Sequence, residues 1–171
     1  MSNAIHQMQM RYVPEEDRIL FRVNSTEKKE YRLWITRRFS LLLIQTLRVH
    51  MDADPDVSRQ ASPDAKQAVK KFKQESAIQD ANFEQKFAEG STQFPLGEEI
   101  PLAFKIAHNI NGENLNLSLQ PKSGQGMNLV LNRQINSSLT QLLMSAIEMA
   151  NWKIEENVIL PDRAKDERVL N

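Results

Sequence analysis

Arginines and one tryptophan alternate with apolar residues along three short segments near the start of the chain. Apolar side chains recur at every second position in residues 8–10, 19–23 and 31–35, which is the period of a β-strand with one buried face. The opposite face then carries the cationic and aromatic candidates, which are Arg11, Arg18, Arg22, Arg32 and Trp34, with Arg38 just beyond the third segment. Guanidinium groups bind phosphates, and an indole ring stacks on unpaired bases. This face is therefore a candidate interface for single-stranded nucleic acid or for a protein partner.

A covered or solvated sheet exterior explains the same residues without a ligand, and we favour that interpretation. Arginines are common on sheet exteriors, and the 22 basic and 22 acidic residues of the whole chain cancel. Trp34 and the neighbouring Leu20 would then meet another element, such as a helix over residues 62–87, or a second subunit.

Residues suited to catalysis or metal binding do not form a recognisable pattern. The three histidines, His6, His50 and His108, lack a partner at a ligand spacing with a carboxylate beside it. The paired carboxylates all fall in predicted turns and linkers, where water solvates them. The glycines of residues 122–126 lack the Gly-Lys-Ser/Thr order of a phosphate loop and fit a hairpin turn. We expect no enzyme activity, no cofactor and no metal.

The elements that position these residues recur in two copies. Residues 31–47 predict a strand that leads directly into an apolar helix, and residues 127–143 repeat the pattern 96 positions later. The same offset extends backwards without a gap over two further predicted strands, so that Met8 and Met10 align with Phe104 and Ile106. We predict an α+β fold of two pseudo-repeated βββα units, although any two such segments would align in this way after sliding.

A helical insertion separates the two units. Ser62, Pro63 and Asp64 are a helix start, with a capping hydroxyl, a proline at the first position and an early carboxylate. An amphipathic helix follows, with Phe72 among its apolar side chains and Gly90 as its expected end. The predicted division is a first unit over 1–51, a linker and insertion over 52–93, a second unit over 94–152 and a charged tail over 153–171, within one compact domain.

Composition narrows the environment. The chain has no cysteine, which fits a reducing cytoplasm, and no apolar run approaches the roughly 20 residues that a membrane-spanning helix needs. We therefore expect a cytoplasmic protein without a membrane partner.

The first predicted helix, which begins after Arg38, is apolar on more than one side, because Leu41, Ile44 and Val49 widen its stripe. The sequence therefore predicts a non-enzymatic binding or assembly protein that self-associates through this helix. Single-stranded nucleic-acid binding through the basic face is the alternative.

Overall fold

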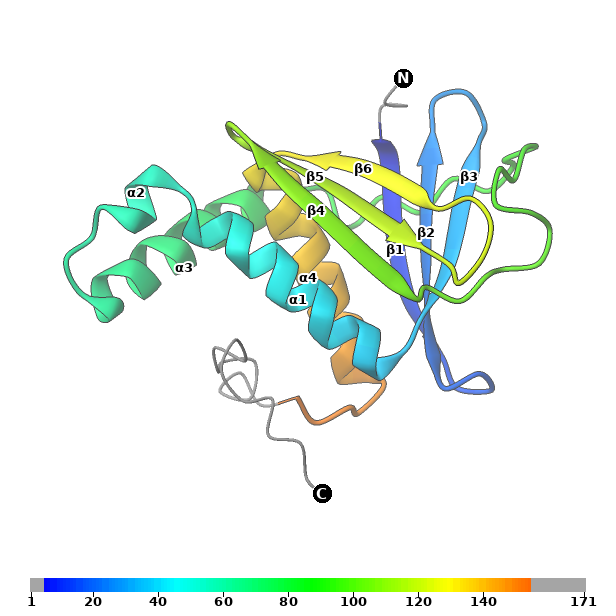
Figure 1. The fold of residues 1–171 in the computed structure, drawn as a ribbon, viewed down its shortest axis with the longest axis horizontal. Coiled ribbons are helices and arrows are strands. Elements are labelled where there is room, and N and C mark those ends of the chain that lie inside the picture. The colour runs from blue at the N-terminus through cyan, green and yellow to red at the C-terminus, as the bar shows by residue number, and fades with distance from the viewer. Residues whose placement is uncertain (1–4, 155–171) are drawn as a thin grey trace.

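Two three-stranded antiparallel sheets and four helices make up the α+β fold (Figure 1). The structure is a computed structural model that describes residues 5–154, so the predicted tail lies almost entirely outside the described residues. The first sheet contains β1 (Ile5–Val13), β2 (Arg18–Ser25) and β3 (Glu30–Ile35), and the second contains β4 (Lys105–Asn111), β5 (Asn114–Gln120) and β6 (Met127–Leu131). The helices are α1 (Arg37–Asp52), α2 (Pro55–Ser58), α3 (Pro63–Asp80) and α4 (Arg133–Met149). None of the helices in the described part of the chain is long and apolar enough to cross a membrane.

Strand alternation places the predicted apolar residues on the inner faces of both sheets. Phe21 pairs with Leu33 across β2 and β3, and Leu117 pairs with Leu129 across β5 and β6, so these two strand pairs share one register at the offset of 96. The first strands do not follow that offset. Met10 pairs with Phe21, whereas Leu117 pairs with His108.

The gapless alignment over the first strand is therefore wrong. The β1–β2 connection spans residues 14–17, but the β4–β5 connection contains only Gly112 and Glu113. Gly112 has a φ of +60°, which a tight two-residue hairpin turn accommodates most easily with glycine at its first position.

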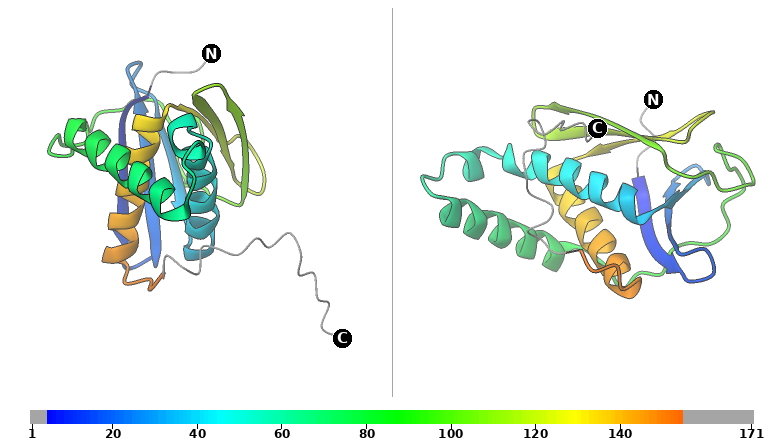
Figure 2. Two further views of the ribbon diagram at one scale, coloured as in Figure 1. Left: turned by 90° about the vertical axis from the view of Figure 1, so that its left-hand side faces the viewer. Right: turned by 60° about the horizontal axis from the view of Figure 1, so that its bottom comes forward.

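The helices α1 and α4 pack against each other and against the sheets. Helix α1 contacts β4 of the second sheet, and α4 contacts β1 of the first (Figure 2). Each helix thus lies against the first strand of the sheet that does not directly precede it. One hydrophobic cluster joins both sheets and both helices, with Phe21, Leu33, Leu117 and Leu139 among its most deeply buried members.

Buried hydrogen bonds fix α1 against α4. The amide Nδ2 of Asn136 donates to the carbonyl of Leu47 at 3.0 Å and to Nδ1 of His50 at 2.9 Å. Because Nδ1 accepts, the ring proton lies on Nε2, which donates to the carbonyl of Glu113 at 3.0 Å. His50 therefore connects α1 both to α4 and to the β4–β5 turn, in its neutral form.

The insertion differs from the sequence prediction at its end and on its surface. Ser62 caps α3 as predicted, accepting from the amide of Ala65, but α3 ends at Asp80 and not at Gly90. Phe72, predicted on the apolar side, is 72% exposed. The reason is that Lys70 and Lys73 turn the opposite, lysine-bearing side of α3 toward carboxylates of residues 52–56, which the following section describes.

The sequence also predicts a strand that begins at Leu102 and a last helix capped by Asn136 or Ser137, and both boundaries differ. Strand β4 begins at Lys105, because Leu102 and Ala103 instead lie along β3. Helix α4 is capped by Asn132, whose side chain accepts from the amide of Ile135. Asn136 and Ser137 are buried within α4.

His50 makes the stability of the protein depend on pH. Burial lowers the pKa of His50 below its ordinary value, and the charge of Arg133 adds to this, although the Glu113 carbonyl and Asp54 oppose it. As pH falls below about 6.5, the unfolded chain takes up a proton that the folded chain refuses, so the free energy of unfolding decreases. The slope from this residue reaches at most about 1.4 kcal/mol per pH unit until the folded pKa is passed.

The check is urea denaturation between pH 7.5 and 5, in which His50→Gln should lose this component of the slope. His108→Gln is the matched control, since His108 is exposed, and it should retain the slope. An unchanged slope in His50→Gln would contradict the assignment.

Candidate functional site

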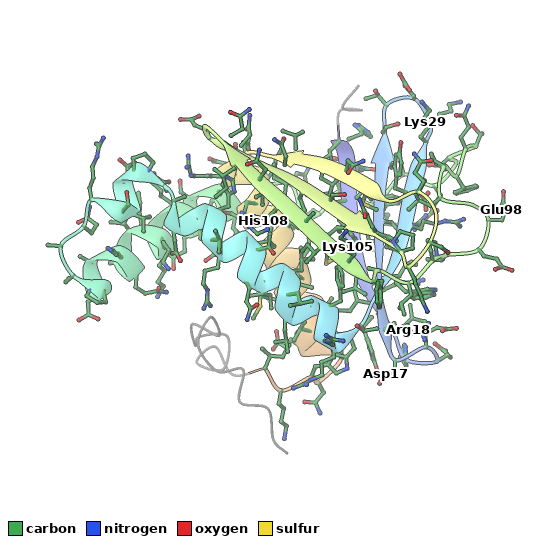
Figure 3. The ribbon with its side chains drawn as sticks, viewed as in Figure 1. Asp17, Arg18, Lys29, Glu98, Lys105 and His108 are labelled. Atoms are coloured by element: carbon green, nitrogen blue, oxygen red, sulfur yellow. The ribbon has the colours of Figure 1, made fainter. Side chains whose placement is uncertain are left out.

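The predicted basic residues lie on the strands of the first sheet, except Arg38, which lies on α1. Arg22 pairs with Arg32 and Leu20 pairs with Trp34 across β2 and β3, and Arg11 pairs with Leu20 across β1 and β2, so these residues share the outer face of the first sheet. Arg18 lies at the start of β2, 3.7 Å from Glu16 (Figure 3). Arg38 lies exposed on the first turn of α1 and is not part of the sheet face.

The chain itself covers this face. Residues 81–104, here called the crossing segment, leave α3 and pass over the outer side of the first sheet. Gln7 of β1 anchors the segment, donating to the carbonyl of Lys86 at 3.1 Å and accepting from the amide of Ala88 at 2.7 Å. Figure 1 shows this segment running from the helical end of the molecule to the far side of β3.

Arg22 is held from three sides. Its guanidinium lies 4.3 Å from the ring centre of Phe87, contacts Glu89 at 2.7 Å and contacts the buried Glu30 at 2.8 Å. The hydrogen bonds that Arg22 donates to Glu89 and to Glu30 raise the pKa of Arg22 above its ordinary value, although burial opposes the change. The hydrogen bond to Arg22 also lowers the pKa of Glu89.

Arg32 and Trp34 contact the second part of the crossing segment. Arg32 lies 4.0 Å from the ring centre of Phe94 and donates to the carbonyls of Gly97 and Glu98, both at 3.0 Å. The backbone of Trp34 donates to Pro101 and accepts from Ala103, both at 2.9 Å. The crossing segment therefore covers the outer face of the first sheet around Arg22 and Arg32 and lies along the edge of β3, whereas Arg11 on the same face stays exposed.

We favour the interpretation that another element covers the basic face, and these contacts agree with it. The covering element is not the predicted helix, however. The covering residues come from the extended chain after α3 and not from a helix over 62–87. Nucleic-acid binding at this face stays an untested hypothesis, and it would require the crossing segment to leave Arg22 and Arg32.

A cluster of charges holds the insertion to the helical core. Asp54 is only 3% exposed, caps α2 by accepting from the amide of Asp56, and contacts Lys73 at 2.7 Å and Arg133 at 3.6 Å. Burial opposes ionisation of Asp54, but the hydrogen bond from Lys73 and the positive charges outweigh it and lower its pKa. The prediction that the acidic residues of 52–56 are simply solvated is therefore wrong for Asp54.

The second sheet, in contrast, has an open outer face. Polar, uncharged side chains dominate it, and within the described residues no segment crosses it; the exposed residues are Lys105, Ala107, Asn109, Asn111, Asn114, Asn116, Asn128 and Val130. The edge of β4 that faces away from β5 pairs with no described strand. Figure 3 shows Lys105 and His108 on this strand, beside α1.

One surface of α1 also stays uncovered. Arg38, Leu42, Gln45, Val49 and Asp52, here called the outer strip, follow one another at helical spacing, and all are exposed. Leu42 and Val49 are 37% and 48% exposed. Helix α1 and β4 run side by side in the same direction (Figures 1 and 2).

The three histidines lie apart, as buried His50, exposed His6 on β1 and exposed His108 on β4. Across residues 5–154, no group of three or more acidic or histidine side chains is placed to hold a metal ion. Sequence reasoning missed the roles of His50 and Asp54. His50 continues the series Phe39, Leu43 and Leu47 at helical spacing, which was a usable sign of its burial.

Comparisons with known proteins give no relative for this chain. No family model matches it, and neither a curated protein nor a solved structure does. The proposals below therefore depend on the geometry alone.

The crossing segment should keep the basic face closed to nucleic acid. With Trp152→Phe leaving Trp34 as the sole tryptophan, a thymidine oligonucleotide at low salt should leave its fluorescence unchanged. Phe94→Ala removes a cation–π contact of about 1 kcal/mol with Arg32, so acrylamide should quench Trp34 more strongly in that variant. Phe72→Ala, on exposed α3, is the matched control and should leave the acrylamide quenching unchanged. Salt-sensitive quenching of the parent chain by the oligonucleotide would show that the segment opens in solution.

Proposed function

We propose that this chain is a non-enzymatic assembly protein, in which β4 pairs with β4 of a second copy. The observation that carries the proposal is the unpaired edge of β4, which runs along α1, a helix that leaves Leu42 and Val49 exposed. Self-association thus uses the first helix, as the sequence predicts, together with a strand edge. Many apolar residues of α1, including Phe39, Leu43 and Leu47, are buried within the fold and are not free to contact a second copy.

The open edge of β4 has a defined set of free backbone groups. A two-residue hairpin turn closes on a hydrogen-bonded pair, which here is Asn111 with Asn114. Hydrogen-bonded positions then alternate along β4, so Ile106, His108 and Ile110 direct their backbone N–H and C=O groups away from β5. Unpaired groups of this kind are a template for another strand.

Antiparallel pairing around His108 satisfies these groups and matches the side chains. A two-fold axis at His108 places Ile106 of one copy opposite Ile110 of the other, with Ala107 opposite Asn109 and Lys105 opposite Asn111. No pair brings two lysines or two carboxylates together. The two second sheets would join into one continuous sheet that has β6 at both ends.

The outer strip of α1 is also complementary to itself. Its order is Arg38, Leu42, Gln45, Val49 and Asp52, so an antiparallel copy places Arg38 near Asp52 and Leu42 near Val49. Pairing of the β4 edges brings the two α1 helices together on the same side of the joined sheet. Charge and apolar contact therefore favour the same two-fold arrangement.

Natural sheets usually protect an open edge with charged residues, proline or a covering segment. The crossing segment covers β3 of the first sheet in this way. Strand β4 carries a single charged residue, Lys105 at its start, and no proline. An unprotected seven-residue edge supports a role in pairing.

We also infer that the two βββα segments are pseudo-repeats and that α2 and α3 are an insertion between them. The shared register of β2–β3 and β5–β6 supports this, as do the helix caps Thr36 and Asn132 at the same offset of 96. The reciprocal contacts of α1 with β4 and of α4 with β1 fit a pseudo-two-fold relation. The two repeats differ in exposure, since only the second leaves its outer face open.

The substitution His108→Pro should prevent the assembly without disturbing the fold of the monomer. His108→Pro removes an N–H that points to the open edge, and edge positions of this kind tolerate proline. The parent chain should sediment as a dimer and His108→Pro as a folded monomer with an unchanged far-ultraviolet circular dichroism spectrum. His108→Thr keeps the N–H and should stay dimeric.

A second pair of variants tests the helix contribution. Leu42→Lys should weaken the dimer at least tenfold, because two lysines would enter the apolar contact, whereas Phe72→Lys on exposed α3 should not change it. A parent chain that stays monomeric at every attainable concentration, or a dimer that survives His108→Pro, would contradict the proposal.

A further inference from the structure

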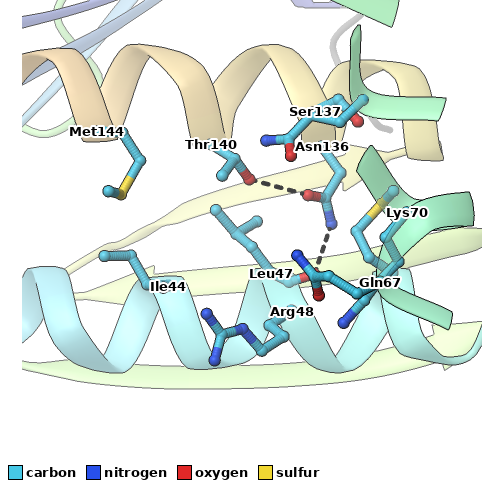
Figure 4. A pocket seen from close by; sticks show the side chains of 11 residues that line it. Ile44, Leu47, Arg48, Gln67, Lys70, Asn136, Ser137, Thr140 and Met144 are labelled. Carbon is cyan, nitrogen blue, oxygen red and sulfur yellow. Dashed lines mark hydrogen bonds between the residues drawn. The ribbon is translucent and has the colours of Figure 1, made fainter. Parts of the chain in front are cut away.

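A pocket separate from the β4 surface lies between the two core helices and the insertion. It has a volume of about 160 Å³ and is bounded by α1, α4 and α3 (Figure 4). A cavity of about this size holds a ring of six carbon atoms. The pocket is therefore large enough for a small organic molecule.

Four apolar side chains line the pocket. Ile44, Leu47 and Met51 line it from α1, and Met144 lines it from α4. Asn136, between them, uses its amide within the protein, since it donates to Leu47 and His50 and accepts from Thr140 at 3.2 Å. The four apolar side chains offer a surface for an apolar body.

The opening of the pocket is cationic and rich in amides. Arg48 of α1 and Lys70 of α3 line it, together with Gln67 and Gln74. Lys70 contacts Asp52 at 2.7 Å, but among the described residues Arg48 has no carboxylate partner. Arg48 thus differs from Arg22 and Arg32, which the crossing segment engages.

We infer that this pocket binds a small organic monocarboxylate with an apolar body, such as an aromatic acid. The ring would lie against Ile44, Leu47 and Met144, and the carboxylate would accept two parallel hydrogen bonds from the guanidinium of Arg48. Gln67 and Gln74 supply further donors at the opening. The inference does not depend on the proposed dimer, because neither the β4 edge nor Leu42 and Val49 line the pocket.

Titration of the full-length protein with benzoate, followed by amide chemical shifts, tests the site. A ligand of this size should bind with a dissociation constant of about 0.1–1 mM and shift amides of α1, α3 and α4 around the pocket. Benzyl alcohol, which keeps the ring but lacks the charge, should bind at least tenfold more weakly. Shifts confined to other parts of the protein would overturn the inference.

Two variants locate the interactions. Arg48→Gln should weaken benzoate binding about 10- to 100-fold while leaving the weak binding of benzyl alcohol unchanged. Arg37→Gln, an exposed arginine at the start of the same helix, is the matched control and should have no effect. Met144→Trp should fill the apolar part and weaken both ligands. Equal binding of benzoate and benzyl alcohol, or an Arg48→Gln variant that binds benzoate as the parent does, would refute a carboxylate site.

Discussion

The hydrogen bonds of His50 and Asn136 are the contact that the rest of the structure depends on. They join α1 to α4, and the Nε2–H of His50 extends the connection to Glu113 in the β4–β5 turn. A buried polar group without a partner is costly, so this network accepts essentially one alignment of the two helices. That alignment sets which side of α1 faces the core and leaves the outer strip exposed.

The two sheets have the same strand order but differ in how their outer faces are covered. Arg22 and Arg32 of the first sheet are taken up by Phe87, Glu89 and Phe94, while the outer face of the second sheet is left to solvent. The difference arises because the long connection after α3 returns over the first sheet before β4 begins. The second sheet therefore keeps an open outer face and an unpaired β4 edge.

Local patterns in the sequence predict much of this fold, but contacts between distant segments limit the prediction. Alternation identifies the inner faces of β2, β3, β5 and β6, and Ser62 marks the start of α3. The cover over Arg22 and Arg32 was missed because the start of residues 81–104 was interpreted as the end of a helix and their last residues as part of a strand, although α3 ends at Asp80 and β4 begins at Lys105. The predicted apolar side of α3 failed for a related reason, since ion pairs of Lys70 and Lys73 with residues 52–56 decide which side turns inward. The pocket could not be predicted either, because no local sequence pattern indicates that Arg48 lies near α3.

The central claim is that the unpaired edge of β4 pairs with a second copy of the chain. Hydrogen exchange of the β4 amides at several protein concentrations tests this claim most directly. The account predicts that the amides of Ile106, His108 and Ile110 exchange quickly in dilute protein and slowly in concentrated protein. Those of Ala107 and Asn109, bonded to β5, should be slow throughout. Equally fast exchange of the three edge amides at every concentration would contradict the account.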